Sequence, residues 1–256
     1  MLCADNVKNK IFPLFSGFYD SLMFSYFDGI LGKGFCDDLN YPKTALICCG
    51  DFYFAAGKPA YAADILNIIG NNPYAVIVPD SDEFAELLIN FDERLYKAER
   101  FHTEPPENGF DRNTLENSAE RINRFKDLRL EKIDRRFYEL SLGEDWSSSF
   151  VINFKSYEDY SRHGFGYIIT DGEKILSGTS TFSYYDKGVE IEVSTDPEHR
   201  LNGFAQITAS AFLLECMKRH LIPHWDARNR TSLSIAEKMG FKFKDCYTAL
   251  EFKQNK

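Results

Sequence analysis

Three consecutive segments in the second half of the chain have the composition of strands, and the third alternates hydrophobic and polar residues, which is the pattern of a half-buried strand. They span residues 167–170, 175–185 and 189–195, and short turns that contain Asp-Gly or Lys-Gly separate them. Turns of this composition between alternating segments favour antiparallel hairpins. The pattern therefore predicts a three-stranded meander.

The third predicted strand leads through a glycine-containing turn into a long apolar helix. The turn is Arg200-Leu201-Asn202-Gly203-Phe204-Ala205, and the predicted helix runs from Gln206 to about residue 220. The first half of this helix is apolar on nearly every side, so we expect it to be buried against the sheet. A closing strand is predicted at 247–252, after a short strand at 223–227.

The glycine turn predicts a binding site for an anion. A helix N-terminus presents backbone N–H groups without helical partners, together with the positive end of the helix dipole. Gly203 allows the backbone to approach a ligand closely, and Arg200 adds a cation beside the turn. We therefore predict a phosphate-bearing ligand at this position.

The first half of the chain predicts a separate α/β region. Residues 1–43 are rich in Phe and Tyr near helical spacing, which indicates one or two core helices in preference to a binding groove. Strands are expected at 44–49, 51–55, 74–78 and 94–102, and helices at 58–69 and 82–91. We place the domain boundary near residue 125, giving an N-terminal region 1–125 and a second domain 126–256.

The order of strand, glycine turn, helix and strand also occurs within residues 52–78. This repetition suggests a decayed second copy of the same unit. It has no arginine at the turn, and Pro59 stands where a backbone N–H would otherwise be available. We therefore expect a structural half that helps to form an acceptor pocket, without a second phosphate site.

Between the two regions, residues 112–127 are polar and charged and are expected to form a helix that leads into the second domain. A loop is predicted at 144–149 and a short helix at 156–163.

Composition narrows the class of protein. The formal net charge of −9 disfavours nucleic acid and anionic membranes as partners and permits an amine-bearing one. The six cysteines form no C-x-x-C pair and no ligand-spaced set with a histidine, so we expect no metal and a reducing, cytoplasmic location. No signal peptide or membrane span is predicted, and the oligomeric state stays open.

The turn carries a resemblance to a known family. Arg200-x-x-Gly203-x-Ala205 resembles the signature of the GNAT superfamily, the acetyl-CoA-dependent N-acetyltransferases. The order that follows, ending in Asn229, Ser232 and Gly240-Phe241, is also similar to that superfamily. Trp225-Asp226-Ala227-x-Asn229 and the long N-terminal extension resemble more narrowly the subgroup of the zwittermicin A resistance protein. These motifs cover roughly residues 126–256.

The resemblance implies an α/β (α+β) fold with a mixed, mainly antiparallel sheet flanked by helices. It implies an acyltransferase that uses acetyl-CoA as co-substrate and an amine as acceptor. The residues it implies for acetyl-CoA binding are Val193, Ser194, Thr195, Arg200, Leu201, Asn202, Gly203, Phe204, Ala205, Gln206, Asn229 and Ser232. For Asn229 a helix cap, and for Ser232 a polar position in the first turn, are alternative roles.

The strand before the turn offers candidates for the general base. Alternation places Val189, Ile191, Val193 and Thr195 on one face and Glu190, Glu192 and Ser194 on the other. By resemblance, Glu192 or Glu190 is the base, with Glu192 preferred because it lies nearer the turn. The alternative is a solvated strand face.

The sequence departs from the family pattern at the general acid. Relatives often carry a tyrosine seven residues after the Asn, and this position is Ala236. Tyr184, Tyr185 and Tyr247 are conceivable substitutes. The departure leaves open a non-catalytic protein that binds CoA or a partner.

Overall fold

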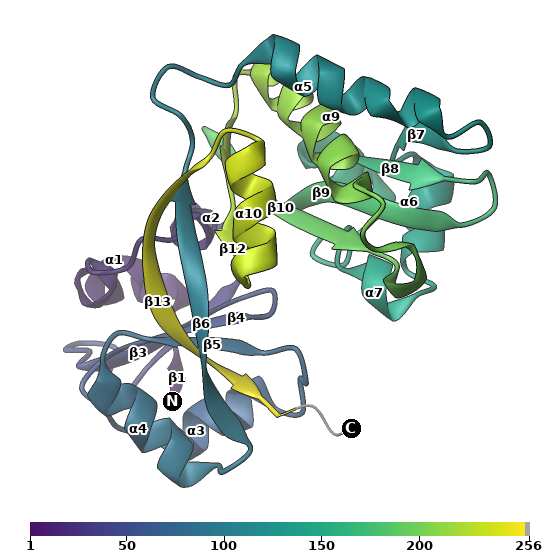
Figure 1. The fold of residues 1–256 in the computed structure, drawn as a ribbon. Coiled ribbons are helices and arrows are strands. Elements are labelled where there is room, and N and C mark those ends of the chain that lie inside the picture. Colours follow the sequence, from purple (N-terminus) through teal and green to yellow (C-terminus); the bar gives the residue numbers. More distant parts are fainter. Residues whose placement is uncertain (254–256) are drawn as a thin grey trace. The chain divides into compact units, whose positions relative to one another are not determined.

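The structure is a computed structural model that describes residues 1–253, and it separates into two compact units. Unit 1 consists of Met1–Arg100 and the end of the chain from Cys246, and unit 2 is Phe101–Asp245. The division therefore falls before the boundary predicted near residue 125. The strands β6 (Leu95–Glu104) and β13 (Lys242–Phe252) contribute residues to both units (Figure 1).

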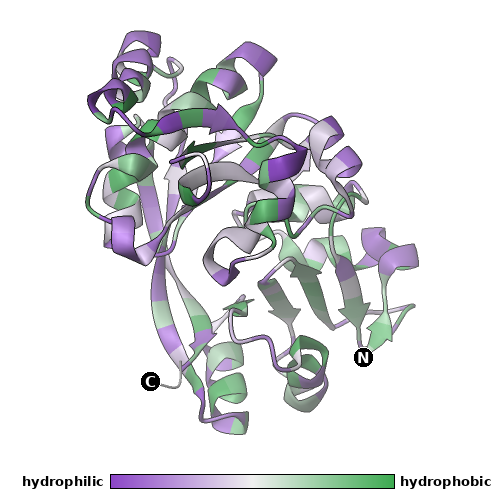
Figure 2. Cartoon of the chain, turned by 90° about the vertical axis from the view of Figure 1, so that its right-hand side faces the viewer, coloured by the Kyte–Doolittle hydropathy of each residue, from purple (hydrophilic) through white to green (hydrophobic). Residues whose placement is uncertain are grey.

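Unit 1 is built on a sheet with the strand order β1-β2-β3-β4-β5-β13-β6. Its other strands are β1 (Leu2–Cys3), β2 (Lys33–Cys36), β3 (Thr44–Cys49), β4 (Phe52–Gly57) and β5 (Val76–Pro79). The helices α3 (Ala62–Ile69) and α4 (Asp82–Phe91) share a core with this sheet that includes Leu46, Ile65, Ile77 and Leu88. In Figure 2 the strands near the N-terminus are largely green, in agreement with their hydrophobic composition.

The aromatic N-terminal segment folds as short helices, in agreement with the predicted core helices. These are η1 (Asp5–Val7), α1 (Lys8–Ile11), η2 (Phe12–Phe15) and α2 (Ser21–Phe27). Ile11, Leu22 and Tyr26 are fully or almost fully buried. The Asp20 carboxylate caps α2 by accepting a hydrogen bond from the N–H of Leu22 at 2.8 Å.

The start of α3 was predicted wrongly at Lys58. Hydrogen bonds hold Lys58 beside the start of β3, because its N–H donates to the carbonyl oxygen of Lys43 at 2.7 Å and its carbonyl oxygen accepts from the Thr44 hydroxyl at 2.8 Å. Tyr61 then adopts a left-handed conformation with a φ of 62°, so the helix begins only at Ala62.

Unit 2 contains a five-stranded sheet with the order β11-β10-β9-β8-β7. The strands are β7 (Arg129–Lys132), β8 (Gly166–Thr170), β9 (Ile175–Tyr185), β10 (Gly188–Thr195) and β11 (Ile222–His224). All neighbours are antiparallel except β10 and β11, which are parallel. The predicted meander is therefore confirmed as β8, β9 and β10.

Helices cover both faces of this sheet. On one face, α9 (Phe204–Arg219) packs through Ile207 against Ile169. On the other face, Ile168 belongs to a core with Phe137 and Phe150. That second layer comprises α6 (Arg135–Ser141), α7 (Asp145–Ser148) and α8 (Tyr157–His163). The segment predicted as a loop at 144–149 thus contains the helical turn α7, with Ser147 buried and its hydroxyl bonded to the carbonyl oxygen of Ser141 at 3.0 Å.

The segment before β7 explains why unit 2 begins ahead of residue 125. It forms α5 (Arg112–Ala119) and η3 (Glu120–Arg124), which pack against α9 (Figure 1). The Phe125 and Phe204 rings meet edge to face with centroids 5.1 Å apart. This segment therefore belongs to the core of unit 2.

Candidate functional site

The predicted glycine turn and helix start are present in unit 2. Gly203 is the N-cap of α9 with a φ of 79°, and no side chain caps the helix. The N–H groups of Gln206 and Ile207 donate to the Gly203 carbonyl oxygen at 3.2 and 3.4 Å. The N–H groups of residues 203–205 precede these bonds and have no hydrogen-bond partner among residues 1–253. They form an array of donors at the positive end of a helix.

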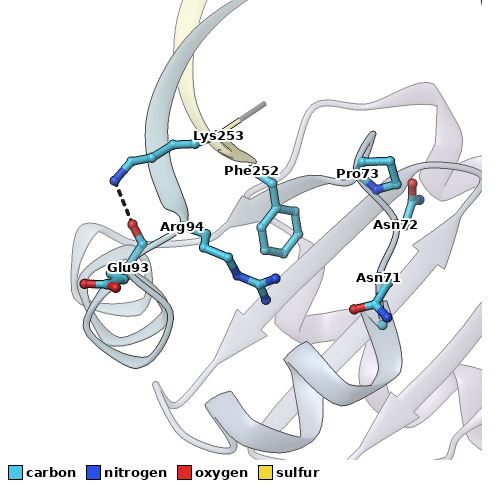
Figure 3. Close-up of a pocket in the computed structure, with 8 residues that line it drawn as sticks. Asn71, Asn72, Pro73, Glu93, Arg94, Phe252 and Lys253 are labelled. Carbon is cyan, nitrogen blue, oxygen red and sulfur yellow. Dashed lines mark hydrogen bonds between the residues drawn. The ribbon is translucent and has the colours of Figure 1, made fainter. Parts of the chain in front are cut away.

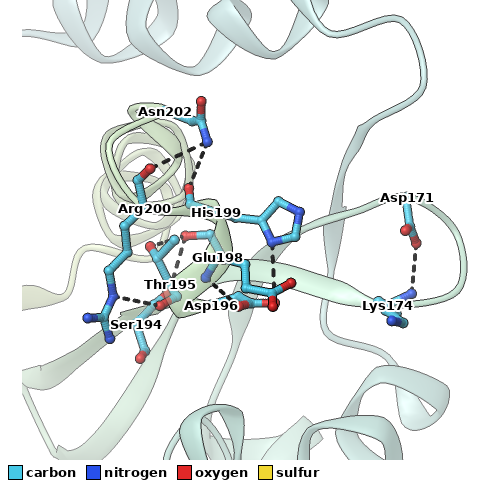
Figure 4. Close-up of polar contacts among 10 residues, drawn as sticks. Asp171, Lys174, Ser194, Thr195, Asp196, Glu198, His199, Arg200 and Asn202 are labelled. Atoms are coloured by element: carbon cyan, nitrogen blue, oxygen red, sulfur yellow. Dashed lines mark hydrogen bonds and ion pairs between the residues drawn. The ribbon is translucent and has the colours of Figure 1, made fainter.

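Side chains hold the segment before α9 in place (Figure 4). The Arg200 guanidinium donates through Nε to the carbonyl oxygen of Thr195 at 3.4 Å, and the Asn202 amide donates to that of His199 at 3.0 Å. Asp196 caps the short helix η4 (Pro197–His199) and lies 3.3 Å from the His199 Nδ1 atom. The turn is thus ordered by its own contacts, and Leu201 within it is fully exposed with a φ of 68°.

The strands β10 and β11 form a fork at Glu190. They pair in parallel as far as Glu190, which lies opposite His224. The chain then leaves β10 through Trp225 and forms β12 (Asp226–Ala227), which pairs with β6. The single strand predicted at 223–227 is therefore wrong, because its two ends pair in different sheets. From Ile191 to Thr195, β10 has a strand neighbour only on the β9 side within the described chain.

The two candidate carboxylates lie in different surroundings. Glu190 is buried, and its Oε1 atom accepts a hydrogen bond from the N–H of Asp226 at 3.0 Å across the fork. Glu192 is partly exposed, and its Oε1 atom accepts a hydrogen bond from the Ser149 hydroxyl at 3.0 Å. The alternative of a solvated strand face is therefore wrong for Glu190.

The three residues of β10 that were predicted to contact acetyl-CoA follow Glu192 and are Val193, Ser194 and Thr195. Val193 packs partly against the hydrophobic core of α9. The Ser177 hydroxyl donates to the Ser194 carbonyl oxygen at 3.1 Å and is hydrogen-bonded to the Thr195 hydroxyl at 2.8 Å. These bonds order the end of the strand where it enters the turn.

Asn229 and Ser232 lie at the start of α10 (Arg230–Lys238). The Asn229 side chain is the N-cap and accepts a hydrogen bond from the N–H of Ser232 at 2.9 Å. The Ser232 hydroxyl accepts one from the indole nitrogen of Trp225 at 3.0 Å. The capping role is confirmed, and a contact with acetyl-CoA stays a prediction.

The position of the usual tyrosine is closed to solvent. Ala236 on α10 is fully buried in a core with Phe212, Trp225 and Met239. A side chain larger than alanine at residue 236 would therefore meet packed neighbours. The alanine that stands in place of the usual tyrosine is therefore part of the hydrophobic core.

The other tyrosines have partners of their own. The Tyr185 hydroxyl and the His224 Nε2 atom are hydrogen-bonded at 2.9 Å, and burial lowers the pKa of His224 to about 4. Tyr184 stacks on His163 at 4.7 Å, and burial raises its pKa. Tyr247 belongs to unit 1, where its hydroxyl accepts a hydrogen bond from the Arg100 Nε atom at 3.2 Å.

Sequence reasoning missed one cation beside the turn. Arg121 on η3 donates through Nη1 to the Gln206 Oε1 atom at 2.9 Å. Its Nη2 atom lies 3.0 Å from the point where a Cβ atom on Gly203 would stand. The local pattern of residues 112–127 predicted a helix but contained no signal for its packing against α9.

In unit 1, a negatively charged side chain lies beside the glycine turn that follows β4. The N–H of Gly57, at the end of β4, donates to the Asp80 carboxylate at 2.6 Å. A carboxylate therefore lies where the turn of unit 2 offers unpaired donors. The absence of a second phosphate site in unit 1 and the interpretation as a decayed copy both stay predictions.

Unit 1 also contains a pocket of about 530 Å³ (Figure 3). Asn71, Asn72, Arg94 and Phe252 line it, with the Arg94 guanidinium 5.3 Å from the Phe252 ring centre. None of the predicted site residues is among its lining residues. Within residues 1–253 no group of three or more His, Cys, Asp or Glu side chains is placed to hold a metal ion, and no helix is long and apolar enough to cross a membrane.

The mixed sheet of unit 2, its fork and its glycine turn define the class of protein, and comparisons with known proteins agree. The family model for GNAT acetyltransferases matches residues 12–250. The chain therefore belongs to the GNAT acetyltransferase family, and the expected fold class is confirmed. The match also includes most of the first half, where the resemblance seen in the sequence was weaker.

The chain is also similar to individual known proteins, to different extents. The chain is similar to the uncharacterized N-acetyltransferase YdfB of Bacillus subtilis, with 30% identity over 111 residues that cover 40% of this chain and 42% of that protein. A GCN5-related N-acetyltransferase-like protein from Streptococcus suis has a TM-score of 0.90 at 29% identity, covering 98% of this chain and 100% of its own. A GCN5-related N-acetyltransferase from Kribbella flavida, at 10% identity and a TM-score of 0.54, covers 100% of this chain and 97% of its own and shows the fold alone.

Proposed function

We propose that this protein is an N-acetyltransferase that moves an acetyl group from acetyl-CoA to the amine of a small molecule. The observation that carries the proposal is the fork at Glu190. It leaves one edge of β10 open from Ile191 to Thr195, and this edge leads directly into the donor array of the turn. An extended pantetheine arm fits the open strand edge, and a pyrophosphate fits the helix N-terminus.

The residues that would hold acetyl-CoA follow from this arrangement. Backbone groups of Val193, Ser194 and Thr195 would bind the arm and orient the acetyl carbonyl. The N–H groups of residues 201–206 and the Arg200 side chain would bind the pyrophosphate. Asn229 and Ser232 would contact the arm in addition to their capping roles. Acetyl-CoA supplies an activated thioester, and the protein supplies binding and proton transfer.

In the reaction, Glu192 would act as the general base, directly or through one water molecule. It accepts a proton from the acceptor ammonium, so that the neutral amine can attack the thioester carbonyl. The new C–N bond forms and the nitrogen releases its second proton to water. The C–S bond then breaks, and water protonates the departing thiolate. Ser149 would hold Glu192 in position by its hydrogen bond. Glu190, which is buried and bonded to backbone, would maintain the fork.

A second candidate function is a protein that binds CoA without catalysis. The observation that favours it is the buried Ala236, which stands where relatives often carry the tyrosine that acts as general acid. A thiolate is a fair leaving group because its conjugate acid has a pKa of roughly 8 to 9. A general acid is therefore helpful without being obligatory, and we favour the enzyme.

One assay separates the two functions. The full chain is incubated with acetyl-CoA and a broad panel of small amines, and free CoA and acetylated product are measured by thiol detection and mass spectrometry. Stoichiometric release of CoA and acetylated amine supports the enzyme. Tight acetyl-CoA binding with no product from any amine supports the non-catalytic protein.

Two finer assignments are also proposals. The Trp225-Asp226-Ala227-x-Asn229 pattern supports membership of the subgroup of the zwittermicin A resistance protein. A cytoplasmic location is supported by the six cysteines, all of which are free thiols.

A further inference from the structure

Two arginine side chains flank the N-terminus of α9. Arg200 lies on the strand side and is bonded to a backbone carbonyl, and Arg121 lies on the η3 side and is bonded to the Gln206 amide. Both acceptors are neutral. Within residues 1–253 neither guanidinium has a carboxylate partner. Among the described residues, neither positive charge is therefore neutralised by a direct ion pair.

This placement is electrostatically unfavourable without a ligand. Cations are favoured at the C-terminus of a helix and disfavoured at its N-terminus, where the dipole is already positive. Here the Arg121 guanidinium and the unpaired N–H groups of residues 203–205 lie together at the start of a helix of 16 residues, and Arg200 adds a second cation in the turn before it. A ligand with more than one negative charge would relieve the repulsion.

The position of Arg121 depends on Gly203. A Cβ atom on residue 203 would stand 3.0 Å from the Arg121 Nη2 atom, which is tighter than most side-chain contacts. Glycine thus lets the guanidinium lie directly beside the backbone of the turn. The hydrogen bond from Nη1 to Gln206 fixes the plane of the guanidinium, so little conformational freedom is lost when it binds a phosphate.

We propose that Arg121 binds the pyrophosphate of acetyl-CoA beside Gly203, with Gln206 as its positioning residue. The inference rests on the proposed function and adds a residue to it. Arg121 precedes the stretch 126–256 that carries the family motifs, so the resemblance does not imply this role. Its planar guanidinium can donate two parallel hydrogen bonds to phosphate oxygens.

Calorimetric titration of the full chain tests the proposal. Wild type, Arg121→Gln and the control Arg124→Gln are each titrated with acetyl-CoA, its 3′-dephospho form and acetyl-pantetheine. Arg124 lies on the same helical turn with an exposed side chain, and its replacement makes the same change in charge. We expect Arg121→Gln to weaken both pyrophosphate-bearing ligands by roughly 10- to 100-fold and to leave acetyl-pantetheine unchanged. Arg124→Gln should match wild type.

Other outcomes overturn the proposal in distinguishable ways. Undiminished affinity, or an equal loss for all three ligands, excludes a phosphate contact while the proposed function stands. A loss restricted to acetyl-CoA assigns Arg121 to the 3′-phosphate and overturns the pyrophosphate contact. Failure of the wild type to bind acetyl-CoA overturns both the inference and the proposed function. Should the Gln variant misfold, Arg121→Lys keeps the charge and is expected to bind several-fold more weakly, and undiminished binding by it overturns the inference.

Discussion

The Glu190 carboxylate accepts a hydrogen bond from the backbone N–H of Asp226 at 3.0 Å, at the point where β10 and β11 separate. Backbone pairing between β10 and β11 stops at Glu190. Beyond this point the Glu190 side chain is the acceptor for the N–H of Asp226. Because Glu190 is buried, this bond has little competition from water. The contact therefore stabilises the fork on which the proposed binding edge depends.

This relationship predicts a structural role for Glu190. Glu190→Ala should lower the free energy of unfolding by about 1 to 3 kcal/mol, because the buried N–H of Asp226 loses its acceptor. Glu190→Gln keeps an Oε1 acceptor and should retain most of the stability. Urea denaturation of both variants measures the difference. An alanine variant as stable as wild type would show that the hydrogen bond does not support the fork.

For Glu192 the expectation concerns rate. Glu192→Gln should lower turnover by about 10² to 10⁴ with little change in acetyl-CoA affinity, because the amide cannot accept the amine proton. Ser149→Ala, which removes only the hydrogen bond to Glu192, serves as a milder comparison and should retain most of the rate. Full turnover across the pH range by the Glu190→Gln and Glu192→Gln single variants and by the double variant would exclude both carboxylates as the base.

Burial of His224 predicts that stability depends on pH. Its pKa is lowered to about 4, whereas an unfolded histidine titrates near 6.5, so the unfolded state binds more protons between these values. The free energy of unfolding should therefore fall by up to about 3 kcal/mol as the pH drops from about 6.5 to 4.

Denaturation curves at several pH values check this expectation. His224→Gln can still hydrogen-bond to the Tyr185 hydroxyl and should lose that part of the pH dependence. The control is His220→Asn, since His220 is exposed with a φ of 58°, a conformation that Asn tolerates, and it should behave as wild type. Equal pH dependence in wild type and His224→Gln would contradict the account.

Ala236 leads to a prediction for alkaline pH. If water protonates the thiolate, turnover should persist above about pH 9 apart from any loss through unfolding. A tyrosine acting as general acid would instead give a falling limb near or above about pH 10. Replacement of Tyr184, Tyr185 and Tyr247 by Phe, one at a time, shows whether any such limb belongs to one of them. We expect no such limb in the wild type and the same alkaline profile in the three variants, because each of these tyrosines has another partner in the structure.

The local features of the fold could be predicted from the sequence. The strand composition of β8 and β9, the alternation along β10 and the glycine turns predicted the meander, and the helices predicted at 82–91 and 156–163 are present as α4 and α8, with Ser81 and Ser156 as N-caps. These features depend on neighbours in the chain. The same is true of Gly203 at the start of α9.

The features that the sequence did not predict depend on contacts between distant segments. The split between β11 and β12 arises because Asp226 pairs with His102 on β6, a residue more than a hundred positions away in the chain. The approach of Arg121 to Gly203 arises from packing of α5 and η3 on α9. Neither is encoded in a local pattern, so the fork and the second cation became visible only in the structure.

The central claim is that the turn at Gly203 holds the phosphates of acetyl-CoA, and calorimetry with Gly203→Val tests it most directly. The control is Gly109→Val. Gly109 has nearly the same φ, 76° against 79°, but no atom within 4 Å of its Cβ position, so it carries the backbone strain without the site. We predict that Gly203→Val loses about 2 kcal/mol or more of acetyl-CoA binding free energy while remaining folded, and that Gly109→Val binds as wild type. Undiminished affinity in a folded Gly203→Val variant would contradict the account.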